Sequence, residues 1–227
     1  KIFDNPESLF DVSSLKPQQP SSSKNSVKDI FKSFSVFDHR NIDATSLTDR
    51  LAYNFVVNRK LTKFKFHICK KGRYANRIII PFQHKGRKPY YFQARNLSLL
   101  GIKYLNPSRE VAGVLSSDVI FPHNEDADYV FLTEGPLDAI SLQLNGLNAT
   151  CTQGSTLSNV QAEQLRGKLL VFAYDNDEAG RYGVEKAREL MLCKNINNFR
   201  VCKLPEGVKD WNELHVKCSN KEFVRVA

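Results

Sequence analysis

The chain has 227 residues, 41% of them hydrophobic, and its 33 Lys and Arg against 24 Asp and Glu give a formal net charge of +9. This length and composition suit one large domain or two modest ones, and no run of about 18 apolar residues exists that could span a membrane. The five cysteines include no CxxC pair and no close Cys/His pairing of zinc-finger spacing, which excludes a zinc-finger module from this segment and favours reduced thiols in a cytoplasmic compartment.

The charge is unevenly distributed along the chain. Residues 50–109 contain fifteen Lys and Arg and no Asp or Glu, whereas residues 111–180 contain two Lys and Arg and ten Asp and Glu. A basic stretch on its own is typical of a solvated surface. A basic stretch beside an acidic one suggests a polyanion held on the first and divalent cations on the second.

The N-terminal segment differs in composition from the rest. Residues 1–26 include KPQQPSSSKNS, which predicts a flexible linker. Because the first residue is Lys rather than Met, we expect the chain to be a piece of a longer protein. Apolar spacing then predicts a short helix within 27–37 and a second helix over 46–59, with Ser46 as its cap.

The hydrophobic period changes between residues 64 and 95. FKFHI alternates apolar with basic residues, RIIIPF is almost continuously apolar, and KPYYFQAR follows the turn-like HKGRK, so we predict a hairpin or small sheet. Cations and aromatic rings together suit single-stranded nucleic acid. The side chains predicted to point outward are Arg73, Tyr74, Arg77, Lys85, Arg87, Lys88, Tyr90 and Arg95.

From residue 129 onward, predicted strands alternate with predicted helices. The strands are YVFLT, ATC, LLVFAY and FRVCKL, and the first helix begins at Pro136, a first-turn position where proline is favoured. Strands that alternate with helices indicate a parallel sheet with right-handed crossovers. The fold class is therefore α/β, with a parallel sheet flanked by helices.

Two of these strands end on carboxylates. Glu134 and Asp138 follow the first, and Asp175 and Asp177 follow the third. Because the carboxyl ends of parallel strands meet at one edge of a sheet, we expect the four acids to converge. A DxD turn alone is equally consistent with helix capping. Acids collected from two strands repel one another unless cations neutralise them, and carboxylate oxygens are ligands that Mg²⁺ prefers.

Glycines accompany the acids. Gly135, Gly154 and Gly180 would allow the backbone to approach a phosphate closely. A phosphatase with a nucleophilic Asp is a poor match, because it generally requires Thr or Val where Ala179 stands and has no use for Glu134.

The acidic motifs, taken in their order along the chain, resemble the Toprim domain of DNA primases, topoisomerases and some nucleases. The matching features are Glu134-Gly135 after a strand, Gly154 in a turn and Asp175-x-Asp177-x-x-Gly180 after another strand. The resemblance implies that Glu134, Asp175 and Asp177 are catalytic metal ligands. Asp138 matches a further acid that primase members often carry, and the resemblance implies that it is a secondary metal ligand.

The preceding basic stretch resembles the DnaG-type primases of bacteria and phages. An Arg precedes an apolar-Pro strand, a Gly-containing turn leads to a second strand that ends in Arg, and Lys-Tyr-Leu-Asn-Pro follows. The short segment between residues 109 and 129 is more like the compact phage enzymes. The resemblance implies that the template- and nucleotide-binding residues are Arg73, Arg77, Arg95, Lys103, Asn106, Gly135 and Gly154.

The segment LPEGVKDWNEL near the end is similar to the closing segment of these primases. Asp210 and Asn212 match an acidic pair there. Asp210 is therefore expected to be a further metal ligand. Asn212 departs from the pattern, and its neutral amide makes a metal-binding role doubtful.

The resemblance implies a primase core that makes short RNA on single-stranded DNA from ribonucleoside triphosphates, with two Mg²⁺ or Mn²⁺ ions activating the 3′ hydroxyl and stabilising the leaving pyrophosphate. It also implies a replicative helicase partner, in trans or fused, and zinc only in a module outside this segment. A Toprim nuclease or topoisomerase fragment and a non-catalytic nucleic-acid-binding protein are the alternatives. We expect a linker at 1–26, a basic α+β subdomain at 27–127, a Rossmann-like Toprim domain at 128–215 and a tail at 216–227.

Overall fold

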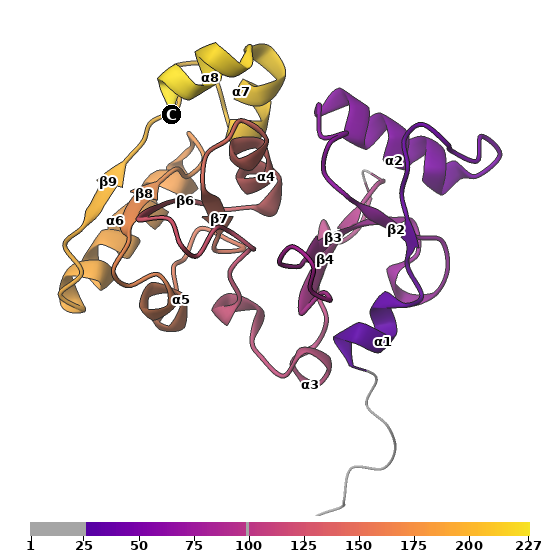
Figure 1. The fold of residues 1–227 in the computed structure, drawn as a ribbon, viewed down its shortest axis with the longest axis horizontal. Helices are drawn as coiled ribbons and strands as arrows, with labels where there is room; N and C mark the ends of the chain where they lie inside the picture. The colour runs from indigo at the N-terminus through magenta and orange to yellow at the C-terminus, as the bar shows by residue number, and fades with distance from the viewer. Residues whose placement is uncertain (1–25, 99) are drawn as a thin grey trace, which may run out of the picture.

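A computed structural model describes residues 26–98 and 100–227. The expected linker at 1–26 lies outside them except for Ser26, which is the N-cap of α1. The described chain forms two lobes that lie side by side (Figure 1). An antiparallel lobe contains α1 to β5, and a parallel lobe contains β6 to α8. Among the described helices, none has both the length and the apolar composition needed to cross a membrane.

The antiparallel lobe is built on a five-stranded sheet in the order β1-β2-β3-β4-β5. Its elements are α1 (Val27–Phe31), β1 (Ser35–Val36), α2 (Leu47–Asn58), β2 (His67–Cys69), η2 (Gly72–Tyr74), β3 (Arg77–Phe82), β4 (Tyr91–Asn96) and β5 (Tyr104–Leu105). The predicted hairpin is β3 and β4, whose register pairs Phe82 with Tyr91 and Arg77 with Asn96. Ser46 caps α2 as predicted, with its side chain accepting a hydrogen bond from the backbone N–H of Asp49.

Three details of this lobe differ from prediction. The helix expected within 27–37 ends at Phe31, and β1 follows it. The side chains of Tyr74 and Arg77 point inward, with exposures of 6% and 8%. Tyr74 packs edge-on against Phe34 and Phe92 at ring-centroid distances of 5.8 and 5.2 Å, so aromatic packing decides its direction.

The parallel lobe is a four-stranded sheet in the order β7-β6-β8-β9, with every neighbouring pair parallel. Its elements are β6 (Tyr129–Thr133), α4 (Pro136–Leu144), β7 (Ala149–Cys151), α5 (Asn159–Gln164), β8 (Leu169–Phe172), α6 (Glu178–Cys193), β9 (Phe199–Val201), α7 (Trp211–Lys217) and α8 (Asn220–Val226). The predicted α/β fold class, with its helix-flanked parallel sheet, is confirmed. The short segments α3 (Arg109–Ala112) and η3 (Ser116–Asp118) connect the lobes.

The last residues are ordered by packing. Residues 216–227, expected as a tail, form the end of α7 and all of α8. Phe223 is fully buried and lies 5.8 Å from the ring of Trp211, which is also fully buried. Burying two large aromatic side chains stabilises this end of the chain against the parallel lobe.

Hydrogen bonds join the two lobes at two places. The Asn212 side-chain amide on α7 donates to the carbonyl oxygen of Arg59 at 3.1 Å, and the His215 ring lies 3.1 Å from the carbonyl oxygen of Lys60. Elsewhere the Gln93 amide donates to the Gln153 side chain at 3.0 Å. These bonds hold the basic strands at a fixed position beside the parallel sheet.

Gly183 on α6 tests how tightly this fold is packed. A side chain there would overlap the carbonyl oxygen of Ser155 and lie 3.0 Å from the Tyr174 ring. Gly183→Ala should therefore lower the free energy of unfolding by about 1–3 kcal/mol, although Ala normally favours a helix by about 1 kcal/mol over Gly. Urea unfolding measures the effect. Gly154→Ala is the control, because a side chain at Gly154 meets open space. A Gly183→Ala variant whose free energy of unfolding equals that of the wild-type protein would contradict the tight packing.

Candidate active site

The acids predicted to converge do so at one edge of the parallel sheet. Glu134 directly follows β6, Asp175 lies three residues after β8, and these strands are adjacent, with Leu132 paired to Phe172. The Glu134 Oε1 accepts a hydrogen bond from the backbone N–H of Asp175 at 3.2 Å. The carboxylate from one strand thus contacts the turn after the other.

Asp175 is one of the two acids of the cluster whose pKa is strongly raised. Burial, followed by the charges of Glu134, Asp210 and Asp177, raises its pKa to about 7. Its Oδ1 is buried and accepts no hydrogen bond within the described part of the chain. A buried, unpartnered carboxylate oxygen beside other acids is a position where a cation would be stabilised.

Asp138 and Asp210 complete the group from two helices. Asp138 lies in the first turn of α4, and its Oδ1 accepts from the backbone N–H of Asn212 at 3.0 Å. Burial and the nearby charges of Asp210, Asp175 and Glu134 raise the pKa of Asp138 to about 8. The acid that the sequence marked as secondary is therefore central to the cluster.

Helix capping and membership of the cluster coincide in two acids. Asp177 is the N-cap of α6 and its Oδ1 accepts from Gly180 N at 2.9 Å. Asp210 is the N-cap of α7 and its Oδ1 accepts from Glu213 N at 2.7 Å. Each of these hydrogen bonds occupies one oxygen. The capping interpretation of the DxD turn is thus correct for Asp177, and capping fixes the direction of both carboxylates.

The donor set fits a divalent cation that keeps water and phosphate ligands. Among the described residues, no three His, Cys, Asp or Glu side chains are arranged as a ready metal cage. Mg²⁺ is usually bound by one or two carboxylates, with waters and substrate phosphates in the remaining positions. The unpartnered oxygen of Asp175 and the raised pKa of both Asp175 and Asp138 are the features expected of such a partial donor set.

Asn212 has a structural role. Its amide nitrogen donates to the Arg59 carbonyl and to Ser141 Oγ at 3.1 and 3.0 Å. The side chain therefore joins α7 to α2 and α4.

Cations of the antiparallel lobe face the acids. Lys103 is exposed and lowers the pKa of Glu134, while burial, the larger effect, raises it. The Arg95 guanidinium lies 4.9 Å from the centre of the Tyr104 ring. Burial raises the pKa of Tyr104 to about 12, with Arg95 opposing and Asp138 reinforcing the shift. Lys103 and Arg95 thus belong to the same site as the carboxylates.

The other predicted binding residues are placed differently. Arg77 Nη1 donates to the carbonyl oxygen of Ala94 at 3.1 Å inside the sheet, and Arg73 is exposed with its guanidinium 5.9 Å from the Tyr74 ring centre. The Asn106 Oδ1 is buried with no partner among the described residues. Gly135 is the N-cap of α4, and Gly154 N donates to the Glu134 carbonyl at 2.9 Å, so both glycines adjoin the acid-bearing turn.

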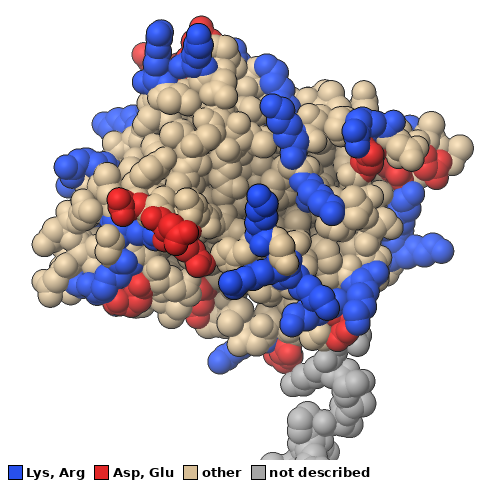
Figure 2. All heavy atoms as spheres, in the orientation of Figure 1, with Lys and Arg blue, Asp and Glu red and all other residues tan. Residues whose placement is uncertain are grey.

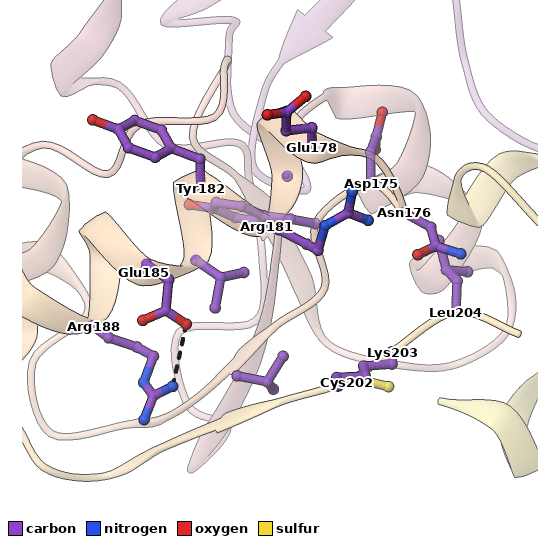
Figure 3. A pocket seen from close by; sticks show the side chains of 14 residues that line it. Asp175, Asn176, Glu178, Arg181, Tyr182, Glu185, Arg188, Cys202, Lys203 and Leu204 are labelled. Atoms are coloured by element: carbon purple, nitrogen blue, oxygen red, sulfur yellow. Dashed lines mark hydrogen bonds and ion pairs between the residues drawn. The ribbon is translucent and has the colours of Figure 1, made fainter. Parts of the chain in front are cut away.

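Figure 2 shows Lys and Arg side chains gathered along the hollow between the lobes, with a patch of acidic side chains on the parallel lobe beside it. A separate cavity of about 710 Å³ adjoins the DxD turn and extends to α6 and to the residues after β9. Figure 3 shows the Asp175 carboxylate pointing away from Lys203 and Leu204, which line that cavity. Asp175 therefore lines one end of this cavity, with its carboxylate directed away from the end formed by Lys203 and Leu204.

The raised pKa of Asp138 predicts a pH dependence of stability in chelator-treated protein. Its ordinary value is 3.8 and its value in the fold is about 8, so between these pH values the folded state retains a proton that the unfolded chain has released. The free energy of unfolding should then fall as pH rises from about 4 to 8. Asp138→Asn, which keeps the acceptor for Asn212 N, should flatten this decline in urea titrations.

The exposed Asp126 provides the control for that titration. Asp126→Asn should retain the slope of the wild-type protein. A wild-type slope in Asp138→Asn would show that other groups cause the pH dependence.

Comparisons with known proteins agree with this arrangement. Residues 131–215 match a family described as Toprim-like. The DNA primase of Mycoplasma genitalium is 26% identical over 166 residues, and that of Clostridium acetobutylicum is 30% identical over 162 residues. Each match covers 68% of this chain and 27% of the relative. The chain thus spans 27% of the length of these curated relatives.

Solved structures extend the likeness to both lobes. A DNA primase domain from Pseudomonas aeruginosa has a TM-score of 0.59 at 27% identity, covering 68% of this chain and 51% of that one. A DnaG primase catalytic domain bound to ssDNA has a TM-score of 0.57 at 21% identity, covering 75% and 58%. The primase fragment of the Bacteriophage T7 primase-helicase protein has a TM-score of 0.56 at 18% identity, covering 92% and 82%. The chain therefore carries a Toprim-like domain within the fold shared by the catalytic cores of DnaG-type DNA primases.

Proposed function

We propose that this chain is the RNA-polymerising core of a DNA primase, a nucleotidyltransferase that joins ribonucleotides on a single-stranded DNA template. The observation that carries the proposal is the convergence of Glu134, Asp138 and Asp175 at one sheet edge, opposite Lys103 and Arg95 of the basic lobe. The relatives named DNA primase and the DnaG structure bound to ssDNA support the choice of reaction and template.

The carboxylates have the role of metal ligands in this proposal. Glu134, Asp175 and Asp177 would hold Mg²⁺ or Mn²⁺, with Asp138 and Asp210 next to them. When bound, such ions supply activation of the 3′ hydroxyl and stabilisation of the leaving pyrophosphate. The protein contributes the fixed direction of these acids, because Asp177 and Asp210 are held by the helix ends that they cap.

The basic lobe would orient nucleic acid and nucleotide. Lys103 and Arg95 lie on the side of the hollow facing the acids, where phosphates with bound cations would be attracted by both groups. Exposed Arg73 suits the template backbone. Arg77 would act by supporting the sheet through its bond to the Ala94 carbonyl.

The partners and cofactors follow the same reasoning. The nucleotide partners are ribonucleoside triphosphates, and the T7 primase-helicase likeness supports a replicative helicase acting in trans or as a fused domain. Zinc would belong to a module outside the present sequence, since residues 1–227 hold no CxxC pair and no close Cys/His pairing of zinc-finger spacing.

Asp175→Asn tests the proposed reaction. The variant keeps its shape but loses a negative charge, so synthesis of short RNA from labelled ribonucleotides should fall at least about a hundredfold, because metal-assisted charge stabilisation is worth several kcal/mol. Binding of a single-stranded oligonucleotide should remain within about twofold. Product analysis on denaturing gels measures synthesis, and fluorescence anisotropy measures binding.

The matched control is Asp126→Asn, an equivalent change at an exposed position, which should polymerise normally. Template cleavage without ribonucleotide joining in the wild-type protein would favour the Toprim nuclease alternative. DNA binding with neither reaction would favour a non-catalytic protein, and full synthesis by Asp175→Asn would contradict the site assignment.

A further inference from the structure

Gln153 lies in the turn after β7, directly beside the acid-bearing turn after β6. The backbone N–H of Thr152 donates to the carbonyl oxygen of Thr133 at 3.0 Å, and that of Gly154 donates to the carbonyl oxygen of Glu134 at 2.9 Å. Gln153 stands between these two donors, and its backbone is in the left-handed region with a φ of 64°. A residue with a long side chain keeps this conformation only where surrounding contacts hold it there.

The side chain of Gln153 uses both of its polar atoms. Its amide nitrogen donates to the carbonyl oxygens of Ser116 and Val119 at 3.0 and 2.8 Å, in the segment that connects the lobes. Its Oε1 accepts a hydrogen bond from the amide nitrogen of Gln93 at 3.0 Å. Backbone carbonyls can only accept, so the Gln153 nitrogen has to face them and its oxygen is left for Gln93. The connector therefore determines the orientation of both amides.

Gln93 places the other end of this bond on the strand that bears Arg95. Gln93 lies two residues before Arg95 in β4, and side chains two residues apart on a strand share a face. Lys103 directly precedes β5, the next strand of the same sheet. One hydrogen bond thus ties the strand that carries a cation of the site to the turn that is bonded to Glu134.

Stability alone does not account for a glutamine at position 93. The residue is 3% exposed, and its Oε1 is buried with no hydrogen-bond partner within the described part of the chain. A buried carbonyl oxygen without a partner is destabilising, and an apolar side chain of the same length would avoid that cost. The amide of Gln93 is therefore better explained by what its bond to Gln153 holds in place.

We infer that Gln93 and Gln153 form a positioning pair, which holds the cations of β4 and β5 at a fixed spacing from the Glu134 carboxylate. This role rests on the proposed function, in which phosphates held by the basic lobe meet cations held by the acids. A displacement of about 1 Å between reacting groups can lower a rate about a hundredfold. A bond that spans the two lobes this close to the acid-bearing turn is placed to prevent such a displacement.

Gln93→Met removes the bond and keeps the length of the side chain. The kcat for joining ribonucleotides should fall about tenfold or more, whereas the KM for the ribonucleotide should stay within about twofold, because Arg95 and Lys103 keep their charges. The urea-unfolding midpoint should equal or exceed that of the wild-type protein, because the buried unpartnered oxygen is gone. A residue with a structural role alone would instead lower the midpoint and leave kcat unchanged.

A second variant tests whether the two glutamines act as a pair. Gln153→Met should lower kcat at least as much as Gln93→Met, because it also releases the connector, and the double variant should be no slower than Gln153→Met alone. The matched control is Gln164→Met. Gln164 is an exposed glutamine whose amide donates to the Asp118 carbonyl in the same connector at 3.1 Å, and its replacement should leave kcat unchanged.

The spacing of the lobes is measured separately from turnover. Spin labels are attached to Cys193, which is exposed on α6, and to the thiol introduced by Arg87→Cys at an exposed position between β3 and β4. Cys202→Ser and Cys218→Ser remove the two partly exposed thiols. Pulsed electron paramagnetic resonance should give one narrow distance distribution for this background and for the control variant. Adding Gln93→Met should shift or broaden that distribution.

An unchanged kcat in Gln93→Met would overturn the inference, and so would an unchanged distance distribution. A double variant whose loss is the product of the two single losses would also overturn it, because the residues would then act independently. A wild-type protein that joins no ribonucleotides, but whose lobes shift in Gln93→Met, would contradict the proposed function and leave the spacing role of the pair in place. The two failures are therefore distinguishable.

Discussion

Repulsion among carboxylates at one sheet edge is the constraint that the rest of this structure accommodates. Glu134 and Asp175 arrive on adjacent parallel strands, and Asp138 and Asp210 come from two helices. Burial, reinforced by the proximity of the other carboxylates, raises the pKa of Asp175 to about 7 and that of Asp138 to about 8. A buried hydrophobic sheet can hold charges in this unfavourable position because the core provides the opposing stabilisation. Bound cations would replace the repulsion among these carboxylates with attraction between each carboxylate and the metal.

Helix geometry and site geometry use the same side chains. Asp177 and Asp210 each satisfy a backbone N–H at a helix start and also contribute charge to the cluster. A cap is held by short-range geometry, so the helices α6 and α7 orient these two carboxylates without a separate support. The choice between capping and ligand binding, which the DxD pattern left open, is therefore not exclusive.

The junction between the lobes depends on a residue that departs from the acidic pattern. Asn212 donates from its amide to Arg59 and Ser141, bonds that an unprotonated carboxylate could not donate. With Asn rather than an acid at position 212, the cluster has one charge fewer, and the side chain instead makes contacts between α7, α2 and α4. It also fixes the end of α2, because one of these bonds goes to the backbone carbonyl of Arg59.

The sequence by itself determined the alternating strands and helices, the Ser46 cap and the meeting of Glu134 with Asp175, because hydrophobic period and strand direction are local properties. It also indicated the capping potential of Asp177. Tertiary structure decided the rest. Tyr74 turns inward because its ring packs against Phe92. Arg77 turns inward because its guanidinium donates a hydrogen bond to the buried carbonyl oxygen of Ala94. Residues 216–227 fold because Phe223 meets Trp211. The end of α2 meets α7 through the hydrogen bond from the Asn212 side chain to the Arg59 carbonyl. This bond joins residues 153 positions apart in the chain, a separation at which local sequence patterns carry no information.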